Sequence, residues 1–254
     1  MFRFSSDRMP VTIILMLSCI DFALYFTTQN PIILFAYWVI MITPKMLISA
    51  WNHHHQHTGT FRIKLLDRAL EFFYAMHTGV TTHLWRLHHV LGHHLNYLDQ
   101  NKDESRWKDD SGKLMGEIKY SFVVALTAYF RGYQVGNRYL KVRRVFVRYT
   151  AITFIILAGL IWLNPIGALF LFILPMMTSL LLTAWATYNH HSELDTSNVF
   201  AASRNNLGKW YNIFTGNLGY HTAHHYKQGV HWSELPKLHD TIKSKIPLEL
   251  ITDA

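Results

Sequence analysis

Residues 31–57 read PIILFAYWVIMITPKMLISAWNHHHQH, an apolar run that ends in a cluster of histidines. Residues 31–51 carry one charged side chain, Lys45, and are long enough for a membrane-spanning helix, which needs about 20 residues. At a rise of about 1.5 Å per residue, a continuing helix would hold His53 about 12 Å beyond Lys45. The stretch therefore predicts a membrane helix that carries histidines just above the bilayer surface.

Three other apolar runs have the composition of membrane helices, and they occupy residues 10–28, 145–163 and 166–188. Pro31 and Pro165 each follow an asparagine, and proline is favoured in the first turn of a helix. Each proline is therefore expected to start the second helix of a hairpin. The predicted fold class is an all-α membrane protein with four transmembrane helices in two hairpins.

The composition agrees with a membrane protein. Hydrophobic residues make up 50% of the chain and charged residues 16%, whereas about a quarter is charged in soluble domains. The first apolar run follows Arg3 and Arg8, but no small-residue cleavage site is evident, which favours a retained anchor over a signal peptide. No internal repeat or low-complexity stretch divides the chain, so we expect one integral-membrane domain over residues 1–254.

The distribution of positive charge predicts the orientation. The connections around Asn30 and Asn164 carry no Lys or Arg, whereas the N-terminus, residues 52–147 and the C-terminus carry nearly all of them. Because cytoplasmic segments are rich in Lys and Arg, we expect the histidines to face the cytoplasm of a bacterial inner membrane, within a cap of helices. Two shorter apolar segments, residues 69–85 and 120–130, are expected to be helices that lie in the membrane interface.

The histidines, 17 in all, gather mainly outside the apolar runs, and their spacing predicts a metal site. Residues four apart share a helix face, so His53 and His57 would point together, as would His89 and His93. Imidazole is the commonest protein ligand for transition metals. The single cysteine, Cys19, lies in an apolar run, which excludes a thiolate site and an intramolecular disulfide. The pattern leaves zinc, copper, nickel and iron open.

Nine imidazoles are enough for two metal ions with four or five ligands each, and burying them without metal would leave many nitrogens unsatisfied, at about 1–3 kcal/mol each. One of the nine comes from the pair His190 and His191 at the end of the last span. The other eight come from the three main clusters: His53, His57, His89, His93, His94, His221, His224 and His225.

Three of these stretches carry a resemblance to a known family. HHHQH (residues 53–57), HHVLGHH (88–94) and HTAHH (221–225) resemble the three histidine boxes of the membrane-bound fatty acid desaturase and hydroxylase superfamily. The HxxGHH spacing of the second box is similar to that of the alkane hydroxylase branch. The end of the last span, residues 188–191, resembles the segment that supplies a further histidine in that family, which places His191 ahead of His190.

The chain also departs from the family's pattern. His88 and His190 stand where alkane hydroxylases have a glutamate before the ligand histidine, so each is either an additional ligand candidate or a replacement for a carboxylate that supports a ligand. His55 is a further ligand candidate. Residues 83–88, HLWRLH, offer an alternative first box, although that choice would leave residues 53–57 without a role.

The resemblance implies two iron ions, O2 as co-substrate, and removal of hydrogen from an unactivated C–H bond of a fatty acyl or related lipid chain. Desaturation is the leading prediction; the alternatives are a fatty acid or alkane hydroxylase, an oxidative decarboxylase that forms a terminal alkene, and a carotenoid ketolase or hydroxylase. Electrons would come from a separate donor such as a ferredoxin or a cytochrome-like protein, and no nucleic-acid partner is expected. A metal transporter or sensor would instead place ionisable residues deep in the spans, where only Asp21 is clearly found.

Several supporting roles follow from position in the chain. The basic residues 138–148 would meet a headgroup or carrier, and the acyl chain would lie between the spans. The residues expected to line that apolar slot are Trp38, Met41, Thr178 and Trp185. The acids expected to accept hydrogen bonds from the ring N–H groups of the ligands are Asp99, Glu193 and Asp195.

Overall fold

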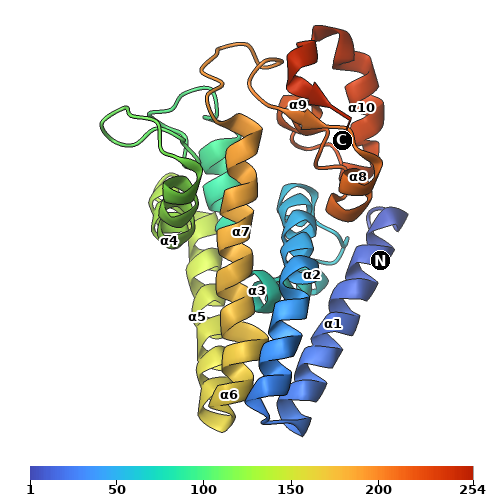
Figure 1. Cartoon of the computed structure of the whole chain (residues 1–254), viewed down its shortest axis with the longest axis vertical. Coiled ribbons are helices and arrows are strands. Elements are labelled where there is room, and N and C mark those ends of the chain that lie inside the picture. The colour runs from blue at the N-terminus through green and yellow to red at the C-terminus, as the bar shows by residue number, and fades with distance from the viewer. Residues whose placement is uncertain (254) are drawn as a thin grey trace.

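The computed structural model describes residues 1–253, in which four long helices stand side by side (Figure 1). They are α1 (Arg8–Thr27), α2 (Pro31–Thr58), α5 (Leu140–Leu163) and α7 (Leu174–His191), the last continuing α6 (Pro165–Ala168) and the π-helical turn η3 (Leu169–Ile173). All four spans are long and apolar enough to cross a membrane. Large apolar side chains such as Ile40 and Trp162 point outward from them. The predicted all-α membrane fold with four spans is confirmed.

Both hairpin turns use an asparagine followed by proline. The side chain of Asn30 accepts a backbone hydrogen bond from two residues further on (3.0 Å), and Asn164 accepts one from three residues further on (2.9 Å). Pro31 and Pro165 then occupy the first helical turn, as predicted. The two turns lie at the end of the bundle opposite the C-terminal segment (Figure 1).

The helix α2 continues beyond the apolar run and carries residues 53–57 on its last turns, before Gly59 ends it at φ 65°. Lower in the same helix, Lys45 is buried, and its ammonium contacts the carboxylate of Asp21 on α1 at 2.7 Å. The bundle therefore buries two ionisable side chains. Lys45 is the charged residue already noted in residues 31–51, but only Asp21 was expected deep in a span. The ammonium of Lys45 is tolerated there because it has an opposite charge beside it.

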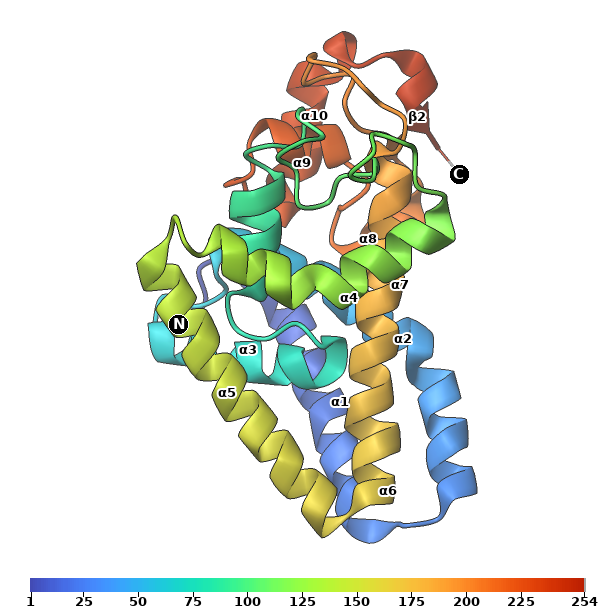
Figure 2. The ribbon, with the colours of Figure 1, turned by 90° about the vertical axis from the view of Figure 1, so that its left-hand side faces the viewer.

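Two helices run across the bundle rather than along it: α3 (Lys64–Thr78) and α4 (Glu117–Val135) (Figure 2). The prediction of a helix over residues 69–85 is wrong beyond Thr78. Gly79 turns the chain there with φ 70°, and a Cβ at this position would lie 2.5 Å from the carbonyl oxygen of Met176. The helix α4 is longer than predicted. Its exposed apolar side chains recur every fourth residue: Ile118, Phe122, Leu126 and Phe130.

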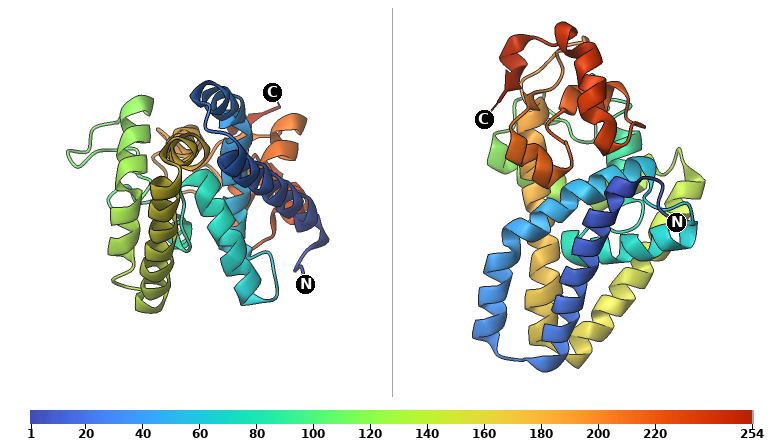
Figure 3. Two further views of the ribbon diagram at one scale, coloured as in Figure 1. Left: turned by 90° about the horizontal axis from the view of Figure 1, so that it is seen from below. Right: turned by 90° about the vertical axis from the view of Figure 1, so that its right-hand side faces the viewer.

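The C-terminal segment forms a cap over one end of the bundle (Figure 3). It holds α8 (Lys209–Thr215), α9 (His221–Tyr226) and α10 (Leu235–Ile242), with the 3-10 turns η4 (Trp232–Glu234), η5 (Lys243–Lys245) and η6 (Leu248–Leu250). A further 3-10 turn, η1 (Ser5–Asp7), precedes α1. The two-residue strands β1 (Asn205–Asn206) and β2 (Ile251–Thr252) pair in parallel, a small departure from the predicted all-α composition.

Apolar packing fixes the elements that carry the histidines. Ile48 and Trp51 of α2, just before the histidine cluster, pack with Tyr74 of α3. Leu87, inside the π-helical segment η2 (Arg86–His93), packs with Ala128 of α4. These contacts hold the ends of α2 and η2 against the rest of the bundle, where their imidazoles can meet.

Candidate metal centre

Four chain segments that are distant in sequence bring their imidazoles together beneath the cap. The end of α2 carries His53 and His57, and α7 ends at His191. The segment η2 with its following residue carries the second cluster, and α9 carries the third. The π-helical winding of η2 changes the predicted i,i+4 pairing, because His89 joins His94 and not His93.

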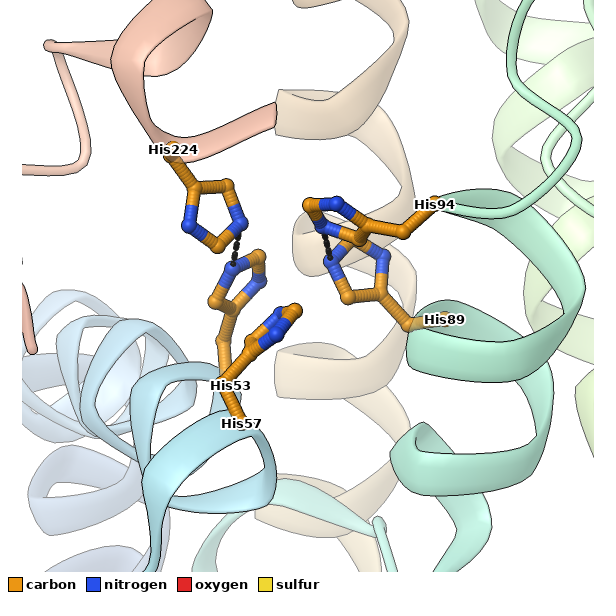
Figure 4. A group of neighbouring side chains, drawn as sticks. All are labelled: His53, His57, His89, His94 and His224. Carbon is orange, nitrogen blue, oxygen red and sulfur yellow. Dashed lines mark hydrogen bonds between the residues drawn. The ribbon is translucent and has the colours of Figure 1, made fainter. Parts of the chain in front are cut away.

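The first histidine group contains five rings whose nearest nitrogens all lie within 4.8 Å of one another: His53, His57, His89, His94 and His224. Figure 4 shows them converging from three segments. The Nε2 atoms of His53 and His224 are 2.8 Å apart, and those of His89 and His94 are 2.9 Å apart. Neither ring nitrogen of His57 has a hydrogen-bond partner, although both are buried.

The second histidine group contains His93, His191 and His225, again within 4.8 Å. His221 adjoins it, since its Nε2 lies 3.0 Å from Nε2 of His191. The two groups are neighbours, because the rings of His94 and His225 stack with centroids 4.0 Å apart. All nine candidate ligands thus lie in one continuous cluster.

Burial disfavours the charged form of three rings that lie outside the spans. It holds the pKa of His89, His94 and His224 well below 6.5, and neighbouring imidazoles lower the pKa further. Neutral imidazoles offer lone pairs, which is the form that binds a metal ion.

The tautomers in the second group can be assigned from their partners. Nδ1 of His93 lies 2.7 Å from the carboxylate of Asp103, and Nδ1 of His191 lies 2.8 Å from the carbonyl oxygen of Ala202. Both oxygens are acceptors, so each Nδ1 carries a proton, and a neutral His191 then has a single lone pair, on Nε2. This Nε2 faces the Nε2 atoms of His93 at 3.3 Å and of His221 and His225 at 3.0 Å each. One lone pair cannot accept three hydrogen bonds, so a cation shared by these nitrogens fits this arrangement. The donor set suits a transition metal.

Asp103 supports a candidate ligand without belonging to either histidine group, and the sequence did not predict this role. It is 1% exposed and lies ten residues after His93, within a loop of several acids. Of the acids expected in this role, Asp99 pairs with Lys102 and Asp195 pairs with Lys108. The side chain of the third, Glu193, forms no hydrogen bond within residues 1–253. The predictions for these three acids are wrong, because nearness in sequence to a histidine does not fix which loop acid folds back over it.

Tyr97 was also not anticipated. Its ring centroid lies 4.4 Å from that of His225, and burial raises the pKa of its hydroxyl to about 12. A tyrosine four residues after His93 lies on a chain reversal that no local pattern in the sequence marks.

The additional ligand candidates lie outside both histidine groups. The ring of His55 faces away toward Thr60 and Glu71. His190 stacks on His221 with centroids 3.9 Å apart, and His88 packs beside Trp85. The alternative box at residues 83–88 therefore contributes no ring to either group.

Comparison with known proteins gives a family. No curated protein and no solved structure matches the chain significantly. The family model described as fatty acid desaturase matches residues 30–252, nearly the whole chain and all three histidine-rich segments. The predicted resemblance is confirmed, and this chain belongs to the fatty acid desaturase family, a family of membrane-bound oxidoreductases that act on lipids.

Proposed function

We propose that this protein is a di-iron fatty acid desaturase that uses O2 to remove hydrogen from an unactivated C–H bond of a fatty acyl chain. The observation that carries the proposal is the convergence of the Nε2 atoms of His93, His221 and His225 on Nε2 of His191, at 3.0–3.3 Å, inside a buried cluster of imidazoles. Membership of the family supports the class of reaction.

Nine residues are proposed as the iron ligands. The first iron would be held by the first histidine group, and the second iron by the second group together with His221. When bound, the iron pair supplies O2 activation and the oxidising equivalents for C–H cleavage. The proposed ligands are His53, His57, His89, His93, His94, His191, His221, His224 and His225.

The surrounding residues would position the ligands and exclude water. Asp103 holds the proton of His93 on Nδ1, and the carbonyl oxygen of Ala202 does the same for His191, so both rings are oriented before a metal arrives. Burial of the rings keeps bulk water away from the reacting bond, which is the protein's main contribution in a reaction of this kind.

The substrate would approach from the membrane. We propose that the acyl chain lies along α2 and α7, near Trp38, Met41, Thr178 and Trp185, all of which are at least partly exposed. The exposed apolar stripe of α4 fits a helix that rests in the membrane interface. The cap would face the cytoplasm of a bacterial inner membrane, where its basic surface suits an acidic electron donor such as a ferredoxin or a cytochrome-like protein.

Mass spectrometry of lipids tests the reaction. Cells that express the wild-type chain should contain a product two mass units lighter than its precursor, and cells that express the double variant His93→Ala/His224→Ala should not. A product sixteen mass units heavier than its precursor would show that the reaction is hydroxylation and not desaturation. A terminal alkene would indicate oxidative decarboxylation. The absence of any new lipid would contradict the proposal.

A further inference from the structure

An open cleft of about 560 Å³ lies beside the first histidine group. Its lining includes His57, whose ring nitrogens are buried and belong to that group. Only the side chain of His57 would therefore separate a molecule in the cleft from the rest of the candidate metal centre. The lining residues are Arg3, Phe4, His57, Thr58, Arg62 and Gly229.

The backbone places two arginines together at this cleft. Phe2 and Phe61 form an antiparallel bridge, flanked by hydrogen bonds from Arg3 N to Thr60 O (2.9 Å) and from Arg62 N to Met1 O (3.0 Å). Side chains alternate along paired segments, so the two phenylalanines share one face and the two arginines share the other. The phenylalanine rings pack with centroids 4.8 Å apart, which fixes the register.

The two guanidinium groups lack a carboxylate partner within 4.0 Å among the described residues. Nε of Arg3 donates to the carbonyl oxygen of Phe61 at 2.9 Å, which orients the group and leaves its terminal nitrogens free of protein acids. The neighbouring acid Asp67 accepts hydrogen bonds from the backbone N–H groups of Thr60 and Phe61. The cleft therefore presents two positive charges that its surroundings do not pair.

The lining of the cleft is apolar as well as basic. Phe4 belongs to it and is 38% exposed. The candidate membrane span that contains α1 begins at the next residue, Ser5. Cationic groups beside an exposed aromatic side chain at the start of a span match an amphiphile that has an anionic head and a hydrocarbon chain.

We propose that this cleft binds the oxyanion head of the lipid substrate, with Arg3 and Arg62 as its cation pair, and that the head is the carboxylate of a free fatty acid. This inference rests on the proposed function, and it narrows the substrate class from lipid chains in general to unesterified acids. A guanidinium pairs with a carboxylate through two parallel hydrogen bonds, a geometry that an ester cannot offer. The phosphate of an anionic phospholipid offers the same chemistry, so the experiment separates the two sources.

The test uses iron-loaded protein in nanodiscs of neutral phosphatidylcholine, with dodecanoic acid and its methyl ester as substrates. Arg3→Gln/Arg62→Gln should raise KM for the acid about tenfold and leave KM for the ester unchanged, because charge-assisted hydrogen bonds to the head are lost. A fluorescent dodecanoic acid should bind the variant about tenfold more weakly, which gives a readout independent of turnover. The matched control Arg8→Gln/Lys64→Gln removes two exposed charges beside the cleft and should change neither value.

Each outcome either supports or overturns the assignment of the cleft to a fatty acid carboxylate. Equal KM and equal binding in the variant and the wild type would overturn the proposal. An effect seen only when phosphatidylglycerol is included would assign the arginines to a phospholipid headgroup and overturn the fatty acid assignment. If the wild type binds the acid but converts no lipid, the proposed function fails, while weaker binding by the variant would still support the cleft.

Discussion

Two polar clusters are buried in this protein, and they are satisfied in different ways. The Asp21–Lys45 network comprises Asp21, Lys45, Tyr37, His77 and Ser18 and pairs its charges within the chain. Among these five side chains only Nδ1 of His77, 3.4 Å from the carboxylate of Asp21, lacks a hydrogen bond. Asp21 accepts from Lys45 and Tyr37 at 2.7 Å each, Lys45 also donates to the carbonyl oxygen of Leu171 at 3.1 Å, and Ser18 pairs with His77 at 2.9 Å.

The histidine cluster is not satisfied in this way. Both nitrogens of His57 lack partners, and the Nε2 atoms of His93, His221 and His225 all face the one Nε2 atom of His191. A buried polar group without a partner costs about 1–3 kcal/mol, so an arrangement of this kind persists when something else completes it. The comparison separates a polar cluster that its own chain satisfies from one that needs an ion. Asp21 and Lys45 are therefore expected to stabilise the fold and not to bind a metal.

The largest effect is expected from removing one ligand of each histidine group. His93→Ala and His224→Ala should each lower the bound iron and reduce turnover below detection, because a lost imidazole leaves an incomplete ligand set. Iron is measured by atomic emission, and folding by thermal unfolding in detergent. The control His239→Ala removes a buried imidazole of α10 outside both groups and should retain its iron. Wild-type iron content in both ligand variants would refute the assignment.

Breaking the Asp21–Lys45 network should lower the free energy of unfolding and leave the iron content of the folded protein unchanged. Lys45→Met leaves the carboxylate of Asp21 buried without its countercharge, at a cost of about 3–5 kcal/mol in the free energy of unfolding. The double variant Asp21→Asn/Lys45→Met removes both charges and should recover most of that loss. Thermal unfolding and iron content are measured on the same samples. Loss of iron from folded Lys45→Met protein would contradict the separation of the two clusters.

Asp103→Asn tests the outer support of the second group. An amide keeps the shape of the side chain and loses its charge, so the iron affinity should fall about 10- to 100-fold while the fold is kept. Competition with a chelator measures the affinity. The matched control is Asp99→Asn, a partly exposed acid of the same loop whose partner is Lys102, and it should leave the affinity unchanged. The reverse pattern would restore the role first expected for Asp99.

The smallest effect concerns pH. Burial, reinforced by the charge of Lys45, holds the pKa of His77 well below 6.5 in the folded protein. Below pH 6.5 the unfolded chain therefore binds a proton at this residue and the folded protein does not, so stability falls as the pH falls from 6.5 toward the lowered pKa. His77→Gln should flatten this dependence by up to about 1.4 kcal/mol per pH unit. Parallel pH curves for the variant and the wild type would show that His77 titrates alike in both states.

The sequence anticipated much of this molecule because its strongest signals are local. Apolar runs of membrane length and the two Asn-Pro turns define four helices without reference to any other segment. The three histidine-rich segments also stand out locally, and the family model covers them all. The end of α3 at Gly79 was missed, because the close approach of Met176 from another helix decides it.

The sequence by itself determined which imidazoles were available and that those of residues 53–57 and 190–191 lie at the ends of membrane helices, since spacing and hydropathy are properties of neighbouring residues. Only the tertiary structure decided how the rings divide into two groups, that Asp103 supports His93, and that Lys45 has Asp21 as its partner. Those outcomes depend on the π-helical winding of η2, on the path of an irregular loop and on the packing of α1 against α2. Each joins segments that are far apart in the chain, and no local pattern encodes which distant atom will lie within hydrogen-bonding distance.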